Sequence, residues 1–273
     1  MMLAPPSTCP AALAFDRLAS DYDSIFTFSA IGKSQRDAVW KQLLSVFAPG
    51  SHILELNCGT GQDALFMARA GMRVTACDAS PRMVEQARAR MAVEEPEADA
   101  EFLTLPTEEI AGLPRTLRFD GLFSNFAGLN CVRDLGSAMR QAAPRLQPEA
   151  PILLCMASRW CLWEILYFLL RGNRTKALRR CGGSSEAQFG ELRFPVFYPT
   201  LSQLRRILAP EYRIVSIAGI GITVPPSCLE SWMARHPRLL RRLEALDAKV
   251  RTWPGLRTIG DHILLHLERV GPC

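Results

Sequence analysis

Short apolar runs alternate with amphipathic segments along most of the chain. Five runs bounded by turn residues are expected to form buried strands, at 51–56, 72–77, 100–104, 119–124 and 151–157. Apolar residues at helical spacing separate them and predict helices, at 62–70, 81–91 and 134–146. Strand and helix repeated at this rhythm predict a parallel sheet that is covered by helices on both faces.

Two helical segments precede the first strand, and two insertions interrupt the later alternation. Residues 14–22 and 34–46 have apolar positions at helical spacing, and we expect residues 1–50 to cover a ligand site on the sheet. The insertions, at about 159–199 and 225–261, are expected to form helical caps. The alternation otherwise continues with a helix at 201–208 and strands at 212–224 and 262–270.

The fold class that these elements predict is α/β. Residues 51–273 are expected to form a doubly wound, Rossmann-like sheet of seven strands, mostly parallel, with an antiparallel last strand. Together with residues 1–50, they are expected to make one compact unit.

Composition and charge narrow the class of protein. A chain of 273 residues with 48% hydrophobic residues is long enough for a sizeable core, and a net charge of +5 without a basic tail does not indicate nucleic-acid binding. The nine cysteines include no Cys-x-x-Cys pair, so we expect neither a disulfide framework nor a metal site. Inert thiols and an N-terminal segment unlike a signal peptide indicate a cytoplasmic protein. The longest apolar run, 160–170, is too short to span a bilayer.

A small, glycine-rich turn connects the first predicted strand to its helix. Its pattern is Glu55-x-x-x-Gly59-x-Gly61, and Asp78 ends the next strand. Backbone N–H groups at such a turn face a ligand, and the acid accepts hydrogen bonds from ribose hydroxyls. No Gly-Lys-Ser/Thr sequence follows, which excludes a Walker-type phosphate loop. Because Glu55 would oppose a pyrophosphate, it suits a ligand with a cationic amino group.

The loop sequence ELNCGTG, the acid Asp78 and the later SNFAGLN together resemble the class I S-adenosylmethionine-dependent methyltransferases of the small-molecule type, over residues 14–157. The resemblance implies S-adenosylmethionine as cofactor and S-adenosylhomocysteine as its product, with Asp78 on the ribose and Glu55 near the methionine amine. Gly59 and Gly61 would let the backbone approach the methionine part. The other contacts that it implies are Ala79 and Met83 on one side of the adenine, Leu105, Pro106 and Thr107 on its other side, Asn125 and Phe126 beside the sulfonium, and Tyr22 closing the pocket.

Two positions depart from the family pattern. Asn57 stands where the first glycine is usual, and Asn adopts left-handed backbone conformations more readily than most residues with a β-carbon, so it stays among the cofactor-binding residues. Pro106 stands where an adenine-binding Asp is common, so adenine N6 would need a backbone acceptor or Glu108. Arg36 could face the carboxylate of the ligand, but a solvated surface position is favoured.

The activity that the resemblance implies is methylation of an oxygen, nitrogen or carbon of a small molecule, in specialised metabolism. In-line displacement requires mainly positioning, and a hydroxyl or amine acceptor must also lose a proton. Candidate bases are Glu164, Tyr167, Tyr198 and His262. Two alternatives stay open: a protein that binds the same cofactor without methylating, such as a pericyclase, a decarboxylase or a regulatory binder, and a nicotinamide or flavin enzyme.

The substrate class is narrowed by the fourth strand and by the first insertion. The strand ends in SNFA rather than the Asp/Asn-Pro-Pro-aromatic sequence of amide and adenine methylation, and no Pro-Cys follows, so nucleic acid is not expected. Aromatic residues from Trp160 onward are expected to line a substrate pocket beside the carboxyl ends of the strands. Basic residues at 171–180 could meet an anionic substrate or lipid headgroups, although a solvated face is favoured over membrane contact. We therefore expect a hydrophobic or anionic small molecule as partner, and a monomer or homodimer.

Overall fold

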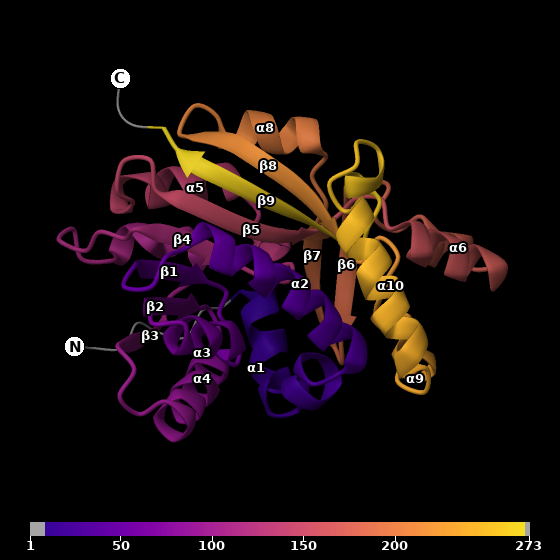
Figure 1. Ribbon diagram of the computed structural model, residues 1–273, viewed down its shortest axis with the longest axis horizontal. Coiled ribbons are helices and arrows are strands. Elements are labelled where there is room, and N and C mark those ends of the chain that lie inside the picture. Colours follow the sequence, from indigo (N-terminus) through magenta and orange to yellow (C-terminus); the bar gives the residue numbers. More distant parts are fainter. Residues whose placement is uncertain (1–8, 271–273) are drawn as a thin grey trace.

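The computed structural model describes residues 9–270, so most of the N-terminal segment used to argue against a signal peptide lies outside the described residues. One sheet of seven strands runs through the molecule in the order β3-β2-β1-β4-β5-β9-β8 (Figure 1). Its strands are β1 (His52–Leu56), β2 (Arg73–Asp78), β3 (Ala100–Thr104), β4 (Gly121–Ser124), β5 (Pro151–Ala157), β8 (Tyr212–Ile220) and β9 (His262–Arg269).

The pairing of the strands confirms the doubly wound, mostly parallel sheet. β1 pairs in parallel with β2 and β4, whereas β9 is antiparallel to both β5 and β8. Leu56 stands opposite Cys77 on one side and Ser124 on the other. Because parallel strands end at the same edge, the residues that follow them in sequence, Asn125 among them, meet at the carboxyl edge of the sheet.

Helices cover both faces of the sheet, as the alternation predicts (Figure 1). In β1, Ile53 packs in one core cluster with Val39 of α2 and Leu65 of α3, and Leu54 packs in the other with Met139 of α5. The helices are α1 (Pro10–Tyr22), α2 (Ala30–Val46), α3 (Gln62–Arg69), α4 (Pro81–Glu94), α5 (Leu135–Ala142), α6 (Leu162–Leu170), α7 (Arg174–Ala177), α8 (Leu201–Leu208), α9 (Glu230–Met233) and α10 (Pro237–Val250). None of the helices within residues 9–270 is long and apolar enough to cross a membrane.

The first insertion contains a hairpin in addition to the helices that the sequence predicts. α6 and α7 are followed by an antiparallel hairpin of β6 (Ser184–Phe189) and β7 (Leu192–Phe197), with Gly190 in a left-handed conformation at its turn. The hairpin forms because Phe194 can bury its ring against Ala11 and Ala14 of α1, a contact between distant parts of the chain.

Two other boundaries differ from the sequence expectation. β8 ends at Ile220 rather than at residue 224, because the backbone N–H of Gly221 turns out of the ladder and donates to the Asp247 carboxylate at 3.2 Å. The helical segment of the second insertion is divided, since Pro237 lacks an N–H and starts a new helix, α10.

The close approach of α3 to α4 depends on Gly61, which has φ +77°. A β-carbon at this position would lie 2.7 Å from the β-carbon of Ala87 and 2.9 Å from its α-carbon. Gly172 has a similar φ of +72°, but its β-carbon would meet nothing within 4 Å. Comparing substitutions at the two glycines therefore separates the cost of left-handed backbone strain from the cost of steric overlap.

We predict that Gly61→Ala lowers the free energy of unfolding by about 3 kcal/mol, because left-handed strain and overpacking add. The matched control, Gly172→Ala, is expected to cost only about 1 kcal/mol, the strain alone. Urea unfolding followed by circular dichroism measures both losses. Equal losses would contradict the claim that contact with α4 requires Gly61.

Candidate functional site

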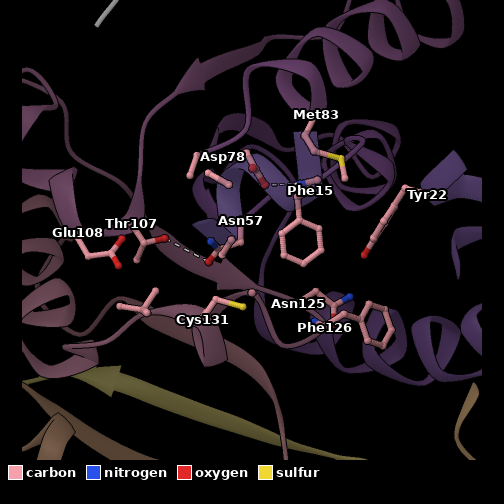
Figure 2. A pocket seen from close by; sticks show the side chains of 16 residues that line it. Phe15, Tyr22, Asn57, Asp78, Met83, Thr107, Glu108, Asn125, Phe126 and Cys131 are labelled. Carbon is pink, nitrogen blue, oxygen red and sulfur yellow. Dashed lines mark hydrogen bonds between the residues drawn. The ribbon is translucent and has the colours of Figure 1, made fainter. Parts of the chain in front are cut away.

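A cavity opens at the carboxyl edge of the sheet, where the loops after β1, β2 and β4 meet (Figure 2). Side chains from α1 complete its wall, including Phe15. Nine residues that the sequence predicts for cofactor binding line it: Tyr22, Asn57, Gly59, Asp78, Ala79, Met83, Thr107, Asn125 and Phe126.

Asp78 ends β2 and fixes the floor of the cavity. Its Oδ2 accepts a hydrogen bond from the N–H of Gly59 at 2.9 Å, and its Oδ1 accepts one from the N–H of Ser80 at 2.9 Å. Burial raises the pKa of Asp78, and the two backbone donors oppose that rise by stabilising the carboxylate. The carboxylate is therefore held rigidly, and each oxygen keeps a lone pair for a further donor.

The turn after β1 uses left-handed backbone at three positions. Asn57 has φ +57°, as expected for an Asn that replaces a glycine. Gly59 has φ +54°, and a β-carbon there would have only Tyr22 within 4.0 Å, so its missing side chain leaves room in the cavity. Gly61 does not line this cavity, because its α-carbon faces Ala87 of α4.

Buried charges lie behind the turn. Glu55 is 1% exposed, and its Oε2 has no hydrogen-bond partner among the described residues. Burial, followed by the charge of Asp63, raises the pKa of Glu55 well above its usual range. An unpaired buried carboxyl is costly, so this group suits a ligand that brings a donor.

Arg36 of α2 is buried as well, so the expectation that it lies on the solvated surface is wrong. It is 5% exposed, and its Nε lies 3.4 Å from Asp63, yet Nε and Nη1 have no hydrogen-bond partner among residues 9–270. Asp63 instead accepts hydrogen bonds from Trp40 at 2.6 Å and Asn125 at 3.2 Å. The guanidinium therefore keeps donors free beside the turn, which suits a ligand carboxylate.

Aromatic rings surround this charged end of the site. Tyr22 packs against Phe26, whose ring lies 5.2 Å from that of Phe126, and the guanidinium of Arg36 lies 5.0 Å from the Phe126 centroid. Burial raises the pKa of Tyr22 to about 12, so its hydroxyl stays protonated at neutral pH. Phe126 and Ala127 have φ +46° and φ +62°, a strained backbone of the kind that occurs at ligand sites.

The segment after β3 contributes less to the cavity than the resemblance implies. Thr107 lines it and donates to Asn57 Oδ1 at 3.2 Å, and Glu108 lines it as well. Leu105 packs against the hydrophobic core, and neither it nor Pro106 is among the lining residues. The lining residues that the sequence did not indicate come chiefly from the start of α1 and from the turn after β4: Ala11, Ala12, Phe15, Gly128, Cys131 and Val132.

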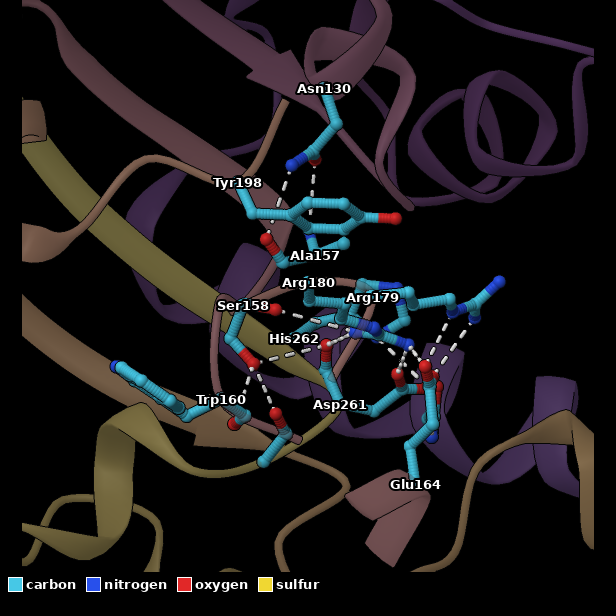
Figure 3. Close-up of polar contacts among 12 residues, drawn as sticks. Asn130, Ala157, Ser158, Trp160, Glu164, Arg179, Arg180, Tyr198, Asp261 and His262 are labelled. Carbon is cyan, nitrogen blue, oxygen red and sulfur yellow. Dashed lines mark hydrogen bonds and ion pairs between the residues drawn. The ribbon is translucent and has the colours of Figure 1, made fainter. Parts of the chain in front are cut away.

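Three of the four candidate bases are engaged elsewhere, and Figure 3 shows the ion pairs of one of them, Glu164. Glu164 binds Arg179 and Arg180 at 2.5 and 2.6 Å, so its carboxylate is neutralised by ion pairs. The Tyr198 hydroxyl lies 3.2 Å from the Ser185 hydroxyl. The ring of Tyr167, on α6, packs against Arg171, which follows the helix. The aromatic residues of α6 do not line the cavity.

His262, at the start of β9, is the candidate base that contacts the cavity wall. Its ring packs edge-on against Phe126 at 5.4 Å between centroids, and its Nδ1 lies 3.7 Å from Asp261. Burial lowers the pKa of His262, and the charge of Asp261 opposes this effect only in part. The imidazole is therefore neutral at pH 7 and can accept a proton.

Arg180 fixes the position of Asp261. The guanidinium donates to Asp261 Oδ1 at 2.9 Å and to the Asp261 carbonyl at 3.1 Å, and Gln35 donates to Oδ2 at 3.4 Å. Burial raises the pKa of Asp261, but the charges of His262 and Arg180 outweigh it, so the net pKa lies below the usual value. His262 thus stands beside a fixed carboxylate that stabilises its protonated form.

Comparisons with known proteins agree with this geometry. Residues 53–149 match the methyltransferase domain family. The chain is 33% identical over 224 residues to a malonyl-[acyl-carrier protein] O-methyltransferase of Serratia marcescens, covering 78% of each chain. It is 30% identical over 164 residues to a demethylmenaquinone methyltransferase of Clavibacter sepedonicus, covering 57% of this chain and 62% of the relative.

A solved structure shares the fold at lower identity. The 1,6-didemethyltoxoflavin-N1-methyltransferase of Burkholderia thailandensis, solved with S-adenosylhomocysteine bound, is 17% identical, with a TM-score of 0.59 over 100% of this chain and 93% of its own. The cavity, the buried groups with free hydrogen-bonding atoms behind the glycine turn and the comparisons agree on one cofactor. The chain belongs to the S-adenosylmethionine-dependent methyltransferases, and S-adenosylmethionine is its cofactor.

Proposed function

We propose that the protein methylates a hydroxyl group of a small organic molecule. The observation that supports the proposal most directly is that two buried groups, Glu55 and Arg36, have polar atoms without hydrogen-bond partners behind a turn that Asp78 anchors. S-adenosylmethionine supplies the methyl group when it is bound. The choice of oxygen as acceptor follows the O-methyltransferase of Serratia marcescens, which the chain covers over 78% of its length.

Each end of the cofactor has a complementary group in this proposal. Asp78 accepts hydrogen bonds from the ribose hydroxyls, while Ala79 and Met83 pack against the adenine. Glu55 accepts from the α-amino group, and Arg36 donates to the α-carboxylate. The fit is chemical as well as geometric, because each of these buried groups gains a hydrogen bond that the described part of the protein does not provide.

His262 acts as the general base in this proposal. A hydroxyl must lose its proton as the oxygen attacks the methyl carbon, and a neutral imidazole at the wall of the site can accept it. Asp261 then stabilises the imidazolium, since the two groups lie within 3.7 Å. Phe126 lines the cavity and packs edge-on against His262, so an acceptor held beside Phe126 lies next to the imidazole.

The experiment that tests the function measures S-adenosylhomocysteine formed by the purified protein with hydroxyl-bearing acceptors, including hydroxyquinones. Methylated product in equal amount to S-adenosylhomocysteine is the expected result. Binding of the cofactor without any methylated product would favour a non-methylating role instead.

We predict that Asp78→Ala weakens S-adenosylhomocysteine binding more than a hundredfold, because two ribose hydrogen bonds to a charged acceptor, of about 1.5–3 kcal/mol each, are lost. Isothermal titration calorimetry measures the dissociation constant. Asp99→Ala is the matched control, since this exposed carboxylate pairs with Arg73 away from the cavity. An unchanged affinity in Asp78→Ala would show that the ribose binds elsewhere.

We predict that Arg36→Met weakens binding of S-adenosylhomocysteine about tenfold to a hundredfold, the loss of a charged hydrogen bond to the α-carboxylate. 5′-Methylthioadenosine lacks the amino-acid part, so its affinity for the variant is expected to equal that for the wild type. The same calorimeter measures both ligands. A parallel loss for both would assign Arg36 to the shape of the pocket rather than to the carboxylate.

We predict that His262→Asn lowers kcat by about a hundredfold or more and leaves S-adenosylhomocysteine affinity unchanged. Because burial holds the pKa of His262 below 6.5, the wild-type kcat/KM should rise with pH through a pKa below that value and then level off as the base becomes neutral. The acid limb should vanish in the variant. A pH profile that Asn leaves unaltered would contradict the role of base.

A further inference from the structure

α6 presents an apolar face to the outside of the molecule. It projects from the side of the fold that holds the first insertion (Figure 1). Its exposed leucines recur at the spacing of one helical face, with exposed fractions of 43% for Leu162, 48% for Leu166, 43% for Leu169 and 88% for Leu170. A face of this kind on a globular protein marks an interaction surface.

Other side chains of α6 fix the helix to the rest of the protein. The indole N–H of Trp163 donates to the carbonyl of Thr223 at 3.1 Å, and the buried carboxylate of Glu164 is held by Arg179 and Arg180. Because these contacts set the rotation of the helix, the leucines point outward as a consequence of the fold.

Cations follow the leucines along the chain. Arg171, Arg174 and Lys176 are exposed, and none of them forms an ion pair within the part of the chain that the structure describes. The Arg171 guanidinium lies 4.5 Å from the centroid of the Tyr167 ring, and the Lys176 ammonium lies 5.7 Å from that of Phe168. The sequence has no Asp or Glu from residue 165 to residue 185, so no acidic residue of this segment offsets the charge.

We propose that this α6 surface, formed by the four leucines and the three cations, binds an anionic membrane surface. The leucines enter the boundary between headgroups and acyl chains, and the cations meet lipid phosphates. Trp160, 46% exposed just before the helix, suits the same depth, because Trp concentrates at membrane interfaces. A second copy of the chain is a poorer occupant, since two-fold pairing of this surface would bring like charges together.

Vesicle sedimentation tests the proposal with the full-length protein. The wild type is expected to sediment with vesicles of phosphatidylcholine and phosphatidylglycerol, and to bind vesicles of phosphatidylcholine alone about tenfold more weakly. The double variant L166S/L170S and the double variant R171Q/K176Q should each reduce partitioning about tenfold. Added salt should weaken wild-type binding and affect R171Q/K176Q less.

Matched controls distinguish vesicle binding through this surface from non-specific adsorption of the protein. Val93→Ser removes an apolar side chain that is 82% exposed on α4, and Arg205→Gln removes an exposed cation on α8, so both should bind vesicles as the wild type does. S-adenosylhomocysteine affinity should be unchanged in all variants, which shows that they fold and keeps this test separate from the reaction. A wild type that stays in the supernatant with both vesicle types, an equal loss in the controls, or a dimer that L166S/L170S dissociates would overturn the proposal.

Discussion

The site depends on the two backbone hydrogen bonds that the carboxylate of Asp78 accepts. The carboxylate accepts one backbone N–H from the turn after β1 and one from the turn after β2, so a single side chain joins the two loops that form the floor of the cavity. Hydrogen bonds to a charged acceptor contribute about 1.5–3 kcal/mol each. That stabilisation helps to hold a turn in which Asn57, Gly59 and Gly61 all have positive φ. The parallel register of β1 and β2 brings the carboxylate within reach.

Buried charge is the second constraint, and it is concentrated around the cavity. Glu55 and Arg36 are almost fully removed from solvent without full hydrogen bonding, an arrangement that costs free energy in the protein alone. On the far side of Phe126, Glu164, Arg180 and Asp261 form an ion-paired network that reaches His262. In this network the carboxylates of Glu164 and Asp261 both pair with Arg180, whereas Oε2 of Glu55 has no hydrogen-bond partner among the described residues.

Local sequence patterns predict the fold and the centre of the site. The features that they miss depend on contacts between residues that are far apart in the sequence. The glycine turn, Asp78 and the SNFA segment could be predicted because each lies at the end of one strand. Arg36 could not, since its burial depends on Asp63, which α3 brings to it. The sequence makes Glu164 a candidate base. In the fold, however, the chain turns back through α7, and two arginines form ion pairs with the Glu164 carboxylate. The β6–β7 hairpin depends on α1, far away in sequence.

The most direct measurement is a crystal structure of the protein with S-adenosylhomocysteine. We expect the ribose hydroxyls to bind Asp78, the α-amino group to bind Glu55 and the α-carboxylate to bind Arg36, with the sulfur beside Asn125 and Phe126. An amino-acid part that points away from Glu55 and Arg36, or a ribose that makes no contact with Asp78, would contradict this expectation.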